Sequence, residues 1–311
     1  MNSGLSVILV NYKNADKTIS CIRALDNQSL LPDCIYIIDN ASGTADREKF
    51  ENAFGTGLAQ SERGIPLQWI WNEQNLGFAA ACNQGIRLSQ ACGFKGYIWL
   101  LNNDTQPEAN ALENILKKAQ ETEAGITGSL ILDARGNVSG GVCRIHPKFA
   151  SVRRVKVPAD SATGEIPFDY VEGSSFLLSP ECINKAGLLP EDYFLYFEEA
   201  DYCTKAKQFG FKMAWARDSI VYHDIASSTK SESRHVPFFI DCLMLRNRIH
   251  FAKKYGFPKW GYTLGLLLSF VLRIKRGEWK HIPKILSIIR SKANYKKFIL
   301  QNGGFIHDEN L

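Results

Sequence analysis

The chain has 311 residues, of which 45% are hydrophobic, and carries a net charge of +5 at pH 7. This length and composition indicate a globular protein with a large core and argue against a disordered chain. Met1 to Leu5 run directly into a strand-like segment, so we expect no secretory signal peptide and a cytoplasmic protein. The eight cysteines include no CxxC pair, which argues against a zinc site.

The charge is distributed unevenly along the chain. Fourteen of the 37 Lys and Arg residues, but only three of the 32 acidic residues, follow Leu245, so this C-terminal segment carries +11 and the remainder −6. A basic tail of this kind predicts an anionic partner, either membrane head groups or nucleic acid. No nucleic-acid-binding motif accompanies the charge, so we expect a membrane surface and no nucleic acid.

The first half of the chain alternates strand-like and helix-like segments. Strands are expected at 6–11, 34–39, 67–71, 97–101 and 126–132, and helices at 15–27, 46–54, 77–91 and 109–122. This alternation predicts βαβ units and a largely parallel sheet with helices on both faces. Residues 133–169 are rich in Gly, Ser, Pro and basic residues and are expected to form a long irregular crossover.

The second half has fewer expected elements. These are a strand at 173–178, a short helix at 180–186, an acidic helix at 198–209 and a strand at 220–224. An apolar stretch at 260–272 is shorter than the roughly 20 residues that a spanning helix needs. Basic and apolar residues follow it at helical spacing, which is typical of a segment lying in a membrane interface. The alternative is a pair of helices packed on the domain with a solvated charged face.

Polar side chains follow the apolar run at 97–101. Asp104 comes directly after Asn102 and Asn103, at the strand end where α/β sheets bind ligands. A carboxylate at this position is suited to hold a divalent cation against a diphosphate, and His223, at the end of another expected strand, would complete a metal site. Alternatively, Asp104 caps the helix that follows.

Two other strand ends carry groups suited to a nucleotide. Tyr12 follows the first strand and Asp39 ends the second, so the ring could stack on a pyrimidine whose imide N–H the carboxylate accepts. Asp39 and Ser42 could instead form an ordinary turn. The segment 75–85 contains small residues that permit close approach of the backbone to a ligand.

Three carboxylates fall within one helical turn at Glu198, Glu199 and Asp201. Like charges this close raise at least one pKa, which suits a general base. The alternative is a solvated helix start, in which Asp201 pairs with Lys205 at i,i+4.

Taken together, these blocks resemble a family 2 glycosyltransferase of the GT-A fold, closest to the bacterial rhamnosyltransferase-like branch. The matching segments are 7–12, 39–42, 75–85, 101–105, 172–174, 197–201, His223 and Arg246-Asn247. The resemblance implies a GT-A domain at 1–245, with a nucleotide-sugar half at 1–133 and an acceptor half at 170–245. Residues 246–311 would then be a basic, helical, amphipathic extension that associates with the membrane.

The resemblance also implies a role for each matching residue. It assigns the nucleotide sugar to Asn11, Tyr12, Asp39, Asn40, Asn75, Gly77, Asn83 and Asn103, and the acceptor to Gly173, Ser174, Glu198 and Arg246. It assigns Mg²⁺ or Mn²⁺ to Asp104 and His223. Glu199 stands where the family commonly has its aspartate base, with Asp201 as the fallback, and Asn102 replaces the first acid of the DxD-type motif.

The expected function is an inverting transfer of a sugar from a nucleotide diphosphate donor to a hydroxyl of a glycan or a polyprenyl-diphosphate-linked acceptor. The branch favours L-rhamnose from dTDP-rhamnose, in bacterial surface polysaccharide synthesis at the inner face of the cytoplasmic membrane, and a UDP-sugar is the other donor considered. Two alternatives stay open: a non-catalytic protein that binds nucleotide sugars, and a sugar nucleotidyltransferase.

Overall fold

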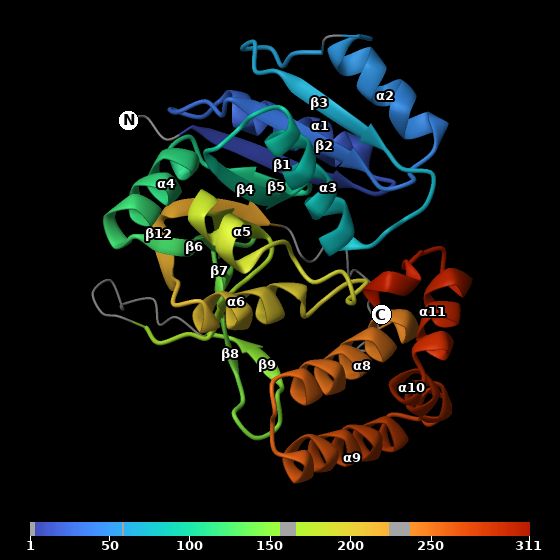
Figure 1. Cartoon of the computed structure of the whole chain (residues 1–311). Coiled ribbons are helices and arrows are strands. Elements are labelled where there is room, and N and C mark those ends of the chain that lie inside the picture. Colours follow the sequence, from blue (N-terminus) through green and yellow to red (C-terminus); the bar gives the residue numbers. More distant parts are fainter. Residues whose placement is uncertain (1–3, 58, 156–165, 224–236) are drawn as a thin grey trace.

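The structure is a computed structural model that describes residues 4–57, 59–155, 166–223 and 237–311 (Figure 1). Its first half alternates strands and helices as the sequence predicts. The elements are β1 (Leu5–Asn11), α1 (Ala15–Asp26), β2 (Cys34–Asp39), α2 (Thr44–Phe54), β3 (Leu67–Trp71), α3 (Phe78–Ala91), β4 (Tyr97–Asn102), β5 (Thr105–Pro107), α4 (Ala111–Thr122) and β6 (Ala124–Leu132).

The second half contains more strands than the sequence predicts. The elements are β7 (Val138–Gly140), β8 (Val142–Ile145), β9 (Val152–Arg154), β10 (Tyr170–Val171), β11 (Ser175–Leu178), α5 (Pro180–Ala186), α6 (Glu198–Gln208), β12 (Lys212–His223), α8 (Phe238–Lys254), α9 (Lys259–Lys275), α10 (His281–Arg290), α11 (Lys292–Gln301) and a terminal 3₁₀ turn (Asp308–Asn310). The expectation of an irregular crossover at 133–169 is therefore wrong in part. Strands β8, β9 and β10 form a small antiparallel sheet, and strands this short carry too little alternation to be recognised. Asp224, expected at the end of the last strand, lies outside the described residues.

One mixed sheet organises the molecule. Its strand order is β3-β2-β1-β4-β11-β6-β12-β5, with β7 added beside β6. Strands β3, β2, β1 and β4 are parallel to one another, and β11 runs antiparallel between β4 and β6. The carboxyl ends of β1, β2 and β4 therefore meet at one edge of the sheet, where polar residues follow all three strands.

The strands bury side chains on both faces of the sheet. In β1, Val7 and Leu9 pack with α1 and α4 on one face, while Ile8 packs with α3 on the other. This division follows from the period of two in a strand. Because both faces are covered, these strands form nearly continuous apolar runs in the sequence.

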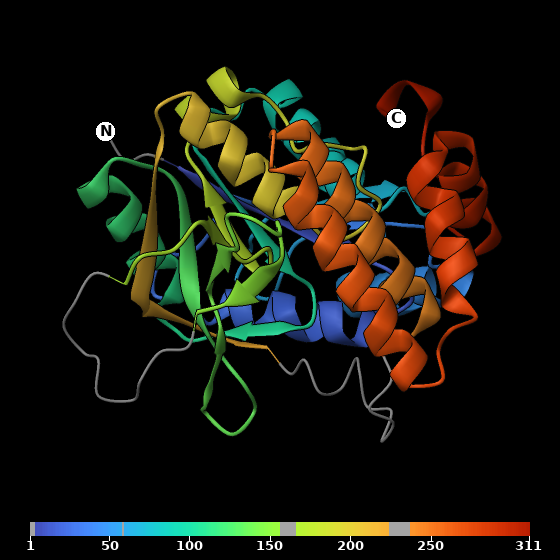
Figure 2. The ribbon, with the colours of Figure 1, turned by 90° about the horizontal axis from the view of Figure 1, so that it is seen from below.

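The four C-terminal helices gather on one side of the molecule in both views (Figures 1 and 2). They share a core that includes Leu243, Ile285 and Phe298. The apolar stretch at 260–272 lies within α9, whose Gly261 and Gly265 are its only buried residues. Within the described ranges, no helix combines the length and apolar character needed to cross a membrane.

The chain after α11 returns to the sheet. Phe305 N donates to the main-chain oxygen of Asn75 at 2.6 Å, and Gly304 forms a parallel bridge with the same residue. Gly304 lies so close to Phe194 that an added Cβ would meet its ring at 2.4 Å. The C-terminal segment is therefore packed against the loop that leads into α3.

Candidate active site

The floor of the candidate site is formed where β1 and β2 end. Asn11 and Asp39 are partners in register, and Asn11 Nδ2 lies 2.8 Å from Asp39 Oδ2 and 2.9 Å from Ser42 Oγ. Ser42 N donates to Asp39 Oδ1 at 2.8 Å, so Asp39 and Ser42 form the turn that the sequence allowed. This turn fixes the orientation of the buried Asp39 carboxylate at the sheet edge.

Asn103, directly after β4, stabilises this floor. Its Nδ2 donates to Thr18 Oγ1 at 2.7 Å and lies 3.3 Å from Asn11 Oδ1. Thr18 Oγ1 in turn donates to Asn11 Oδ1 at 2.7 Å. The amides that follow two neighbouring strands are therefore held in one network, and α1 contributes the hydroxyl that joins them.

Tyr12 lies beside Asn11 at the edge of the candidate site, with 41% of its surface exposed. The Lys13 ammonium lies 5.1 Å from the centre of its ring. A Cβ added to Gly303 would lie 3.9 Å from Tyr12 Oη, so the returning C-terminal segment borders this ring. An exposed aromatic face above buried carboxylate and amide groups is suited to hold a planar base.

Asn40, Asn75 and Gly77 are brought together, as expected. Asn40 Nδ2 donates to Asn75 Oδ1 at 2.8 Å, and Asn75 Oδ1 also accepts from Gly77 N at 3.0 Å. Gly77 has φ +82°, and an added Cβ would lie 2.3 Å from Phe194 O. Only glycine fits this position, because both the backbone conformation and the close approach exclude a side chain.

Asn83 does not face this site. It is fully buried, its Nδ2 donates to Leu189 O at 2.9 Å and to Glu191 Oε1 at 2.8 Å, and its Oδ1 accepts from Leu189 N. These bonds use the hydrogen-bonding groups of its amide. Asn83 therefore joins α3 to the loop before α6 and is not available to a ligand, contrary to the expectation.

Asp104 and His223 meet because β5 pairs with the end of β12, placing His223 opposite Thr105. His223 Nε2 lies 3.1 Å from Asp104 Oδ1, and Lys17 Nζ lies 3.8 Å from Asp104 Oδ2. The alternative in which Asp104 caps the next helix is wrong, because β5 intervenes and the N-cap of α4 is Asn110.

The fit of a divalent cation to this pair rests on its donor atoms. His223 Nε2 faces Asp104 Oδ1 at 3.1 Å, and the carboxylate and imidazole offer two ligand atoms of the kind that Mn²⁺ and Mg²⁺ accept. No group of three or more His, Cys, Asp or Glu side chains that could hold a metal occurs in the described part of the chain. Two protein ligands leave coordination positions for substrate phosphates, so the residues present fit a cation that binds together with a donor.

Glu199 lies at the start of α6 and faces the segment before β11. A Cβ added to Gly173 would be 3.9 Å from Glu199 Cδ, and Glu199 Oε2 is buried without a hydrogen-bond partner. Burial, helped by the charge of Glu172, raises the pKa of Glu199 to about 7. A carboxylate that titrates near neutral pH is suited to accept a proton.

The Glu199 and Asp104 regions are adjacent through the main chain. Asn102 N donates to Ser174 O at 3.1 Å, which joins the end of β4 to the segment that contacts Glu199. Glu172, which precedes this segment, is held by Gly141 N at 2.9 Å and by Arg154 Nε at 2.7 Å. Ser174 Oγ is buried and has no partner. The expected acceptor residues Gly173 and Ser174 therefore lie between the metal pair and the candidate base.

Glu198 and Asp201 differ from Glu199 in their surroundings. Glu198 is buried, and both burial and the charge of Glu199 raise its pKa well above the usual range. Asp201 is fully buried and accepts from Tyr193 Oη at 2.8 Å, from Tyr255 Oη at 2.7 Å and from Lys254 Nζ at 2.9 Å. Asp201 therefore holds α8 to α6, and its contacts do not support it as an alternative base. Its predicted pairing with Lys205 is replaced by the contact with Lys254.

Arg246 and Asn247 fix the turn that precedes α6. Asn247 Nδ2 donates to Leu195 O and to Tyr196 O, both at 2.8 Å. Tyr196 and Phe197 have φ values of +69° and +78°, which non-glycine residues rarely adopt. Arg246 is buried, so it does not offer its guanidinium to an acceptor as expected. It donates to Asp192 O at 3.0 Å and lies 3.7 Å from the centre of the Tyr295 ring.

Three contributors to the site were not predicted from the sequence, the first being the Thr18 hydroxyl that joins Asn11 and Asn103. Lys17 adds a cation beside Asp104, and the only signal for it was its place in the first helix after β1. Asn247 holds the turn before α6, and its signal was present in the Arg-Asn pair, although the resemblance assigned a role only to Arg246.

Comparison with known proteins gives three findings. The sequence profile described as "Glycosyl transferase family 2" matches residues 6–166. The low-salt glycan biosynthesis hexosyltransferase Agl10 of Haloferax volcanii is 23% identical over 209 residues, covering 67% of this chain. The chain spans 63% of the length of that protein.

Solved structures share the fold. GalNAc-T7, crystallised with UDP, GalNAc and Mn²⁺, superposes with a TM-score of 0.59 at 17% identity, covering 81% of this chain and 48% of that one. The mannosyltransferase PcManGT of Pyrobaculum calidifontis, crystallised with GDP-Man and Mn²⁺, gives 0.54 at 14% identity, covering 83% and 66%. The predicted α/β architecture of the GT-A type is thereby confirmed. Since the matching profile spans slightly more than half of the chain, the protein belongs to glycosyl transferase family 2.

Proposed function

We propose that this glycosyltransferase moves a hexose from a nucleotide diphosphate donor to a hydroxyl of a glycan or lipid-linked acceptor, with inversion. The observation that carries the proposal is the placement of Glu199, with a pKa near 7, beside the main-chain segment that joins it to Asp104. A base and a diphosphate-binding acid on one sheet edge are the two groups that such a displacement requires.

In this proposal the chain performs one displacement. Glu199 accepts the proton of the acceptor hydroxyl while that oxygen forms a bond to the anomeric carbon. The bond from the anomeric carbon to the diphosphate breaks, and its electron pair leaves with the nucleoside diphosphate. Lys17 Nζ, 3.8 Å from Asp104 Oδ2, contributes positive charge on the side where the diphosphate would lie.

Asp104 and His223 would hold Mg²⁺ or Mn²⁺, which would neutralise charge on the diphosphate. The proximity of His223 Nε2 to Asp104 Oδ1 and the two-ligand donor set support this assignment. The presence of Mn²⁺ in the structures of GalNAc-T7 and PcManGT also supports it. The asparagine at position 102 leaves Asp104 as the acid of the motif, so we propose that the cation binds tightly only together with the donor.

Tyr12, Asp39 and Asn40 would bind the base and ribose, with Asn11 and Asn103 holding the floor beneath them. Asn75 and Gly77 would line the diphosphate and sugar. Support comes from the exposed Tyr12 ring above the buried Asp39 carboxylate. The nucleotides in the related structures, UDP and GDP-mannose, belong to those proteins. For this chain we propose a dTDP- or UDP-sugar, with dTDP-L-rhamnose as the specific donor and surface polysaccharide as the product.

We also propose that α9 docks on an anionic membrane. Its outward side chains form the α9 surface, which consists of Trp260, Leu264, Leu267, Leu268, Val271, Leu272 and Ile274, each more than two-fifths exposed. Lys275 and Arg276 follow this surface directly, and Lys280 lies in the next segment. Apolar side chains that insert at the lipid boundary beside basic residues are the pattern of an interfacial helix. This placement would bring a polyprenyl-linked acceptor to the inner face of the cytoplasmic membrane.

In this proposal, residues 1–245 form the catalytic part, with the donor half at 1–133 and the acceptor half at 170–245. Residues 246–311 form the membrane-associated extension. The extension also supports the catalytic part, because Asn247 and Phe305 bond to its loops.

The test is a binding and transfer experiment on the purified chain. Calorimetric titration with dTDP-, UDP- and GDP-sugars, with and without Mn²⁺, is expected to give metal-dependent binding of one donor that Asp104→Ala abolishes. Incubation of that donor with lipid-linked glycan acceptors is expected to extend one of them by a single sugar. Donor binding without transfer to any acceptor, or transfer that Glu199→Gln leaves intact, would count against the proposed mechanism.

A further inference from the structure

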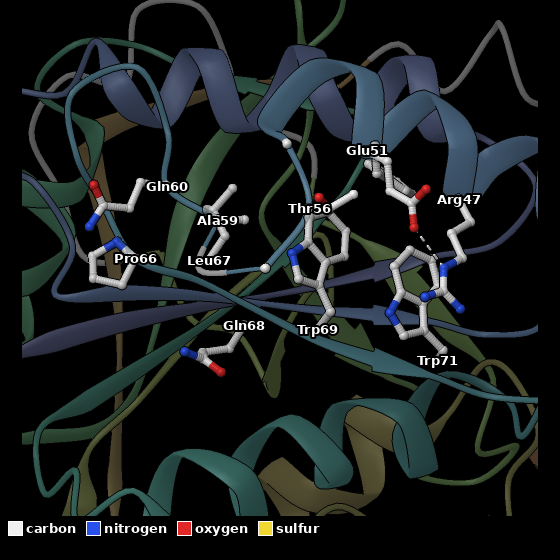
Figure 3. Close-up of a pocket in the computed structure, with 13 residues that line it drawn as sticks. Arg47, Glu51, Thr56, Ala59, Gln60, Pro66, Leu67, Gln68, Trp69 and Trp71 are labelled. Atoms are coloured by element: carbon white, nitrogen blue, oxygen red, sulfur yellow. Dashed lines mark hydrogen bonds and ion pairs between the residues drawn. The ribbon is translucent and has the colours of Figure 1, made fainter.

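A cavity of about 440 Å³ lies at the outer edge of the sheet, where its lining residue Trp71 is the register partner of Asp39, so it adjoins the Asp39 end of the candidate site and is distant from Glu199. It opens between α2, residues 55–57 and 59–60, and strand β3, which is an outermost strand of the sheet (Figure 3). β3 is separated from β11 by β2, β1 and β4. At the usual strand spacing this places the cavity roughly 19 Å across the sheet from β11, the strand beside Glu199. The volume falls in the range of small-molecule sites.

One wall of the cavity is aromatic. Trp69 and Trp71 alternate with Gln68 along β3, so both indoles point to the same face, and they stack at 5.3 Å with an angle of 6° (Figure 3). Phe50 of α2 packs against Trp69 at 4.7 Å. Both tryptophans remain partly exposed. Two large, rigid rings are thus held at a solvent-accessible edge, where they offer apolar contact at low entropic cost.

The rim of the cavity is polar and carries no net charge. Arg47 Nε donates to Glu51 Oε1 at 3.0 Å, and these are the two charged residues that line the cavity. Gln60 also lines it, and within the described ranges its side-chain amide makes no hydrogen bond. This amide presents two donors and one acceptor to whatever occupies the cavity, whereas the Gln68 side chain points to the opposite face of β3 (Figure 3).

This lining selects a neutral ligand with an apolar face and a rim of hydroxyl groups. Phosphates and other ions are disfavoured, because Arg47 and Glu51 neutralise each other and no surplus charge would compensate the desolvation of an ion. A purely apolar ligand would leave the Gln60 amide unpaired. A sugar ring meets both conditions, since its C–H groups pack on the indoles and a hydroxyl bonds to this amide.

We propose that this cavity is a carbohydrate subsite that holds a neutral sugar of a glycan. On the basis of the function proposed above, that glycan is the acceptor, bound at a distance from the hydroxyl that receives the new sugar. Holding the chain at a second point raises the effective concentration of its reactive end at Glu199. Long acceptors are then used more efficiently than short ones of the same terminal structure.

The test measures glycan binding directly, without transfer. Purified full-length protein is titrated with neutral tri- to hexasaccharides of glucose, mannose, galactose and rhamnose, and binding is followed by tryptophan fluorescence and by calorimetry. At least one series is expected to bind, and to bind equally well to the Asp104→Ala variant. Trp71→Ala is expected to weaken binding about tenfold, which corresponds to the loss of about 1.4 kcal/mol of aromatic contact.

Two further variants distinguish loss of the subsite from loss of the folded structure. Gln60→Ala removes an exposed amide without disturbing the packed rings, and it is expected to weaken binding several-fold. Phe209→Ala, at an exposed aromatic residue outside the cavity, is expected to leave binding unchanged. Binding that neither Trp71→Ala nor Gln60→Ala affects would overturn the proposal, as would the absence of binding to every glycan. So would selective binding of extended peptides along the free edge of β3.

Kinetics distinguish this proposal from the function on which it rests. Trp71→Ala is expected to raise the KM for a long acceptor and to leave kcat, and the KM for a short acceptor, unchanged. Glycan binding in the cavity without any sugar transfer would contradict the proposed function but support the subsite. Transfer that Trp71→Ala slows equally for long and short acceptors would contradict the subsite.

Discussion

The Nε2 atom of His223 lies 3.1 Å from the Oδ1 atom of Asp104. If this pair holds the cation, replacing either residue removes one of only two protein ligands. We expect Asp104→Asn and His223→Ala each to weaken metal-dependent donor binding by at least about tenfold. Calorimetric titration of the donor with and without Mn²⁺ measures the effect.

The control for this prediction is Asp133→Asn, which changes an exposed acid whose bonds go to its own turn. It should leave donor binding unchanged. Equal donor affinity with and without Mn²⁺ in the unaltered protein would show that Lys17 alone supplies the charge beside Asp104.

Activity should depend on the protonation of Glu199. Its pKa is raised to about 7, and a base must be deprotonated to act, so kcat should rise with pH through about 7 and then level off. A rate profile between pH 5 and pH 9 at saturating donor and acceptor measures this. A profile already flat at pH 5 would contradict the assignment of a buried base.

Substitution of Glu199 by Gln should reduce kcat by about 10²–10⁴-fold and stabilise the fold at alkaline pH. The folded-state pKa lies above the unfolded value, so the folded protein holds the proton between about pH 4.5 and pH 7 while the unfolded chain has lost it. Stability therefore falls as pH rises through that window. Glu199→Gln should abolish this loss, with a gain on the order of 1–3 kcal/mol at pH 8.

Asp201→Asn is the matched comparison for Glu199→Gln, because it is another isosteric change on α6. Here the carboxylate has three partners, one of which is Lys254, so the change should lower the melting temperature instead of raising it. Thermal unfolding of the two variants at pH 8 should give shifts of opposite sign.

Asn247→Ala should impair transfer more than donor binding. The change removes both hydrogen bonds that hold the left-handed turn at Tyr196 and Phe197, each worth about 0.5–1.5 kcal/mol. Glu199 follows this turn, whereas Asp39 and Asn75 lie on other elements. We expect a fall in kcat with a nearly unchanged donor Kd. Asn294→Ala, at an exposed position of α11, is the control, and a parallel loss of donor binding would mean that Asn247 stabilises the whole site.

The α9 surface should determine membrane binding. Leu267→Glu combined with Leu268→Glu places two carboxylates among exposed apolar side chains and should greatly reduce sedimentation with vesicles that contain anionic lipid. Binding of the unaltered protein should weaken as salt is raised, because basic residues contribute to it. Leu300→Glu changes an exposed leucine on α11 and serves as control. Equal sedimentation of all three proteins would refute the role of α9.

The main strands could be predicted because each is a short apolar run bounded by turn residues. β2 and β3 begin and end where the sequence predicts. The polar residues at their ends were found for the same reason, since parallel strands bring their carboxyl ends to one edge. The strands β7, β8 and β9 were missed because they have only three or four residues each.

The roles of individual polar residues were harder to predict. Successive residues of a helix are rotated by about 100°, so Glu199 and Asp201 point to nearly opposite sides of α6 although both belong to one acidic cluster. Asn83 bonds to Leu189 and Glu191, which are distant in sequence, and its small-residue surroundings gave no sign of this. Local sequence patterns therefore identified the segments that form the site. Hydrogen bonds to residues distant in sequence determine which of their side chains remain available to a ligand.

The contact between Phe305 and Asn75 affects how this protein can be divided into fragments. Ending the chain after Leu245 would be a direct way to test whether activity needs the proposed membrane-associated extension. Here such a truncation would also delete Asn247 and the main-chain donor that Asn75 accepts from. Loss of activity in the fragment would not reveal whether a membrane is needed. Helices α8 to α11 and the segment after them therefore support the loops at Asn75 and Leu195, so residues 246–311 cannot be removed without altering the candidate site.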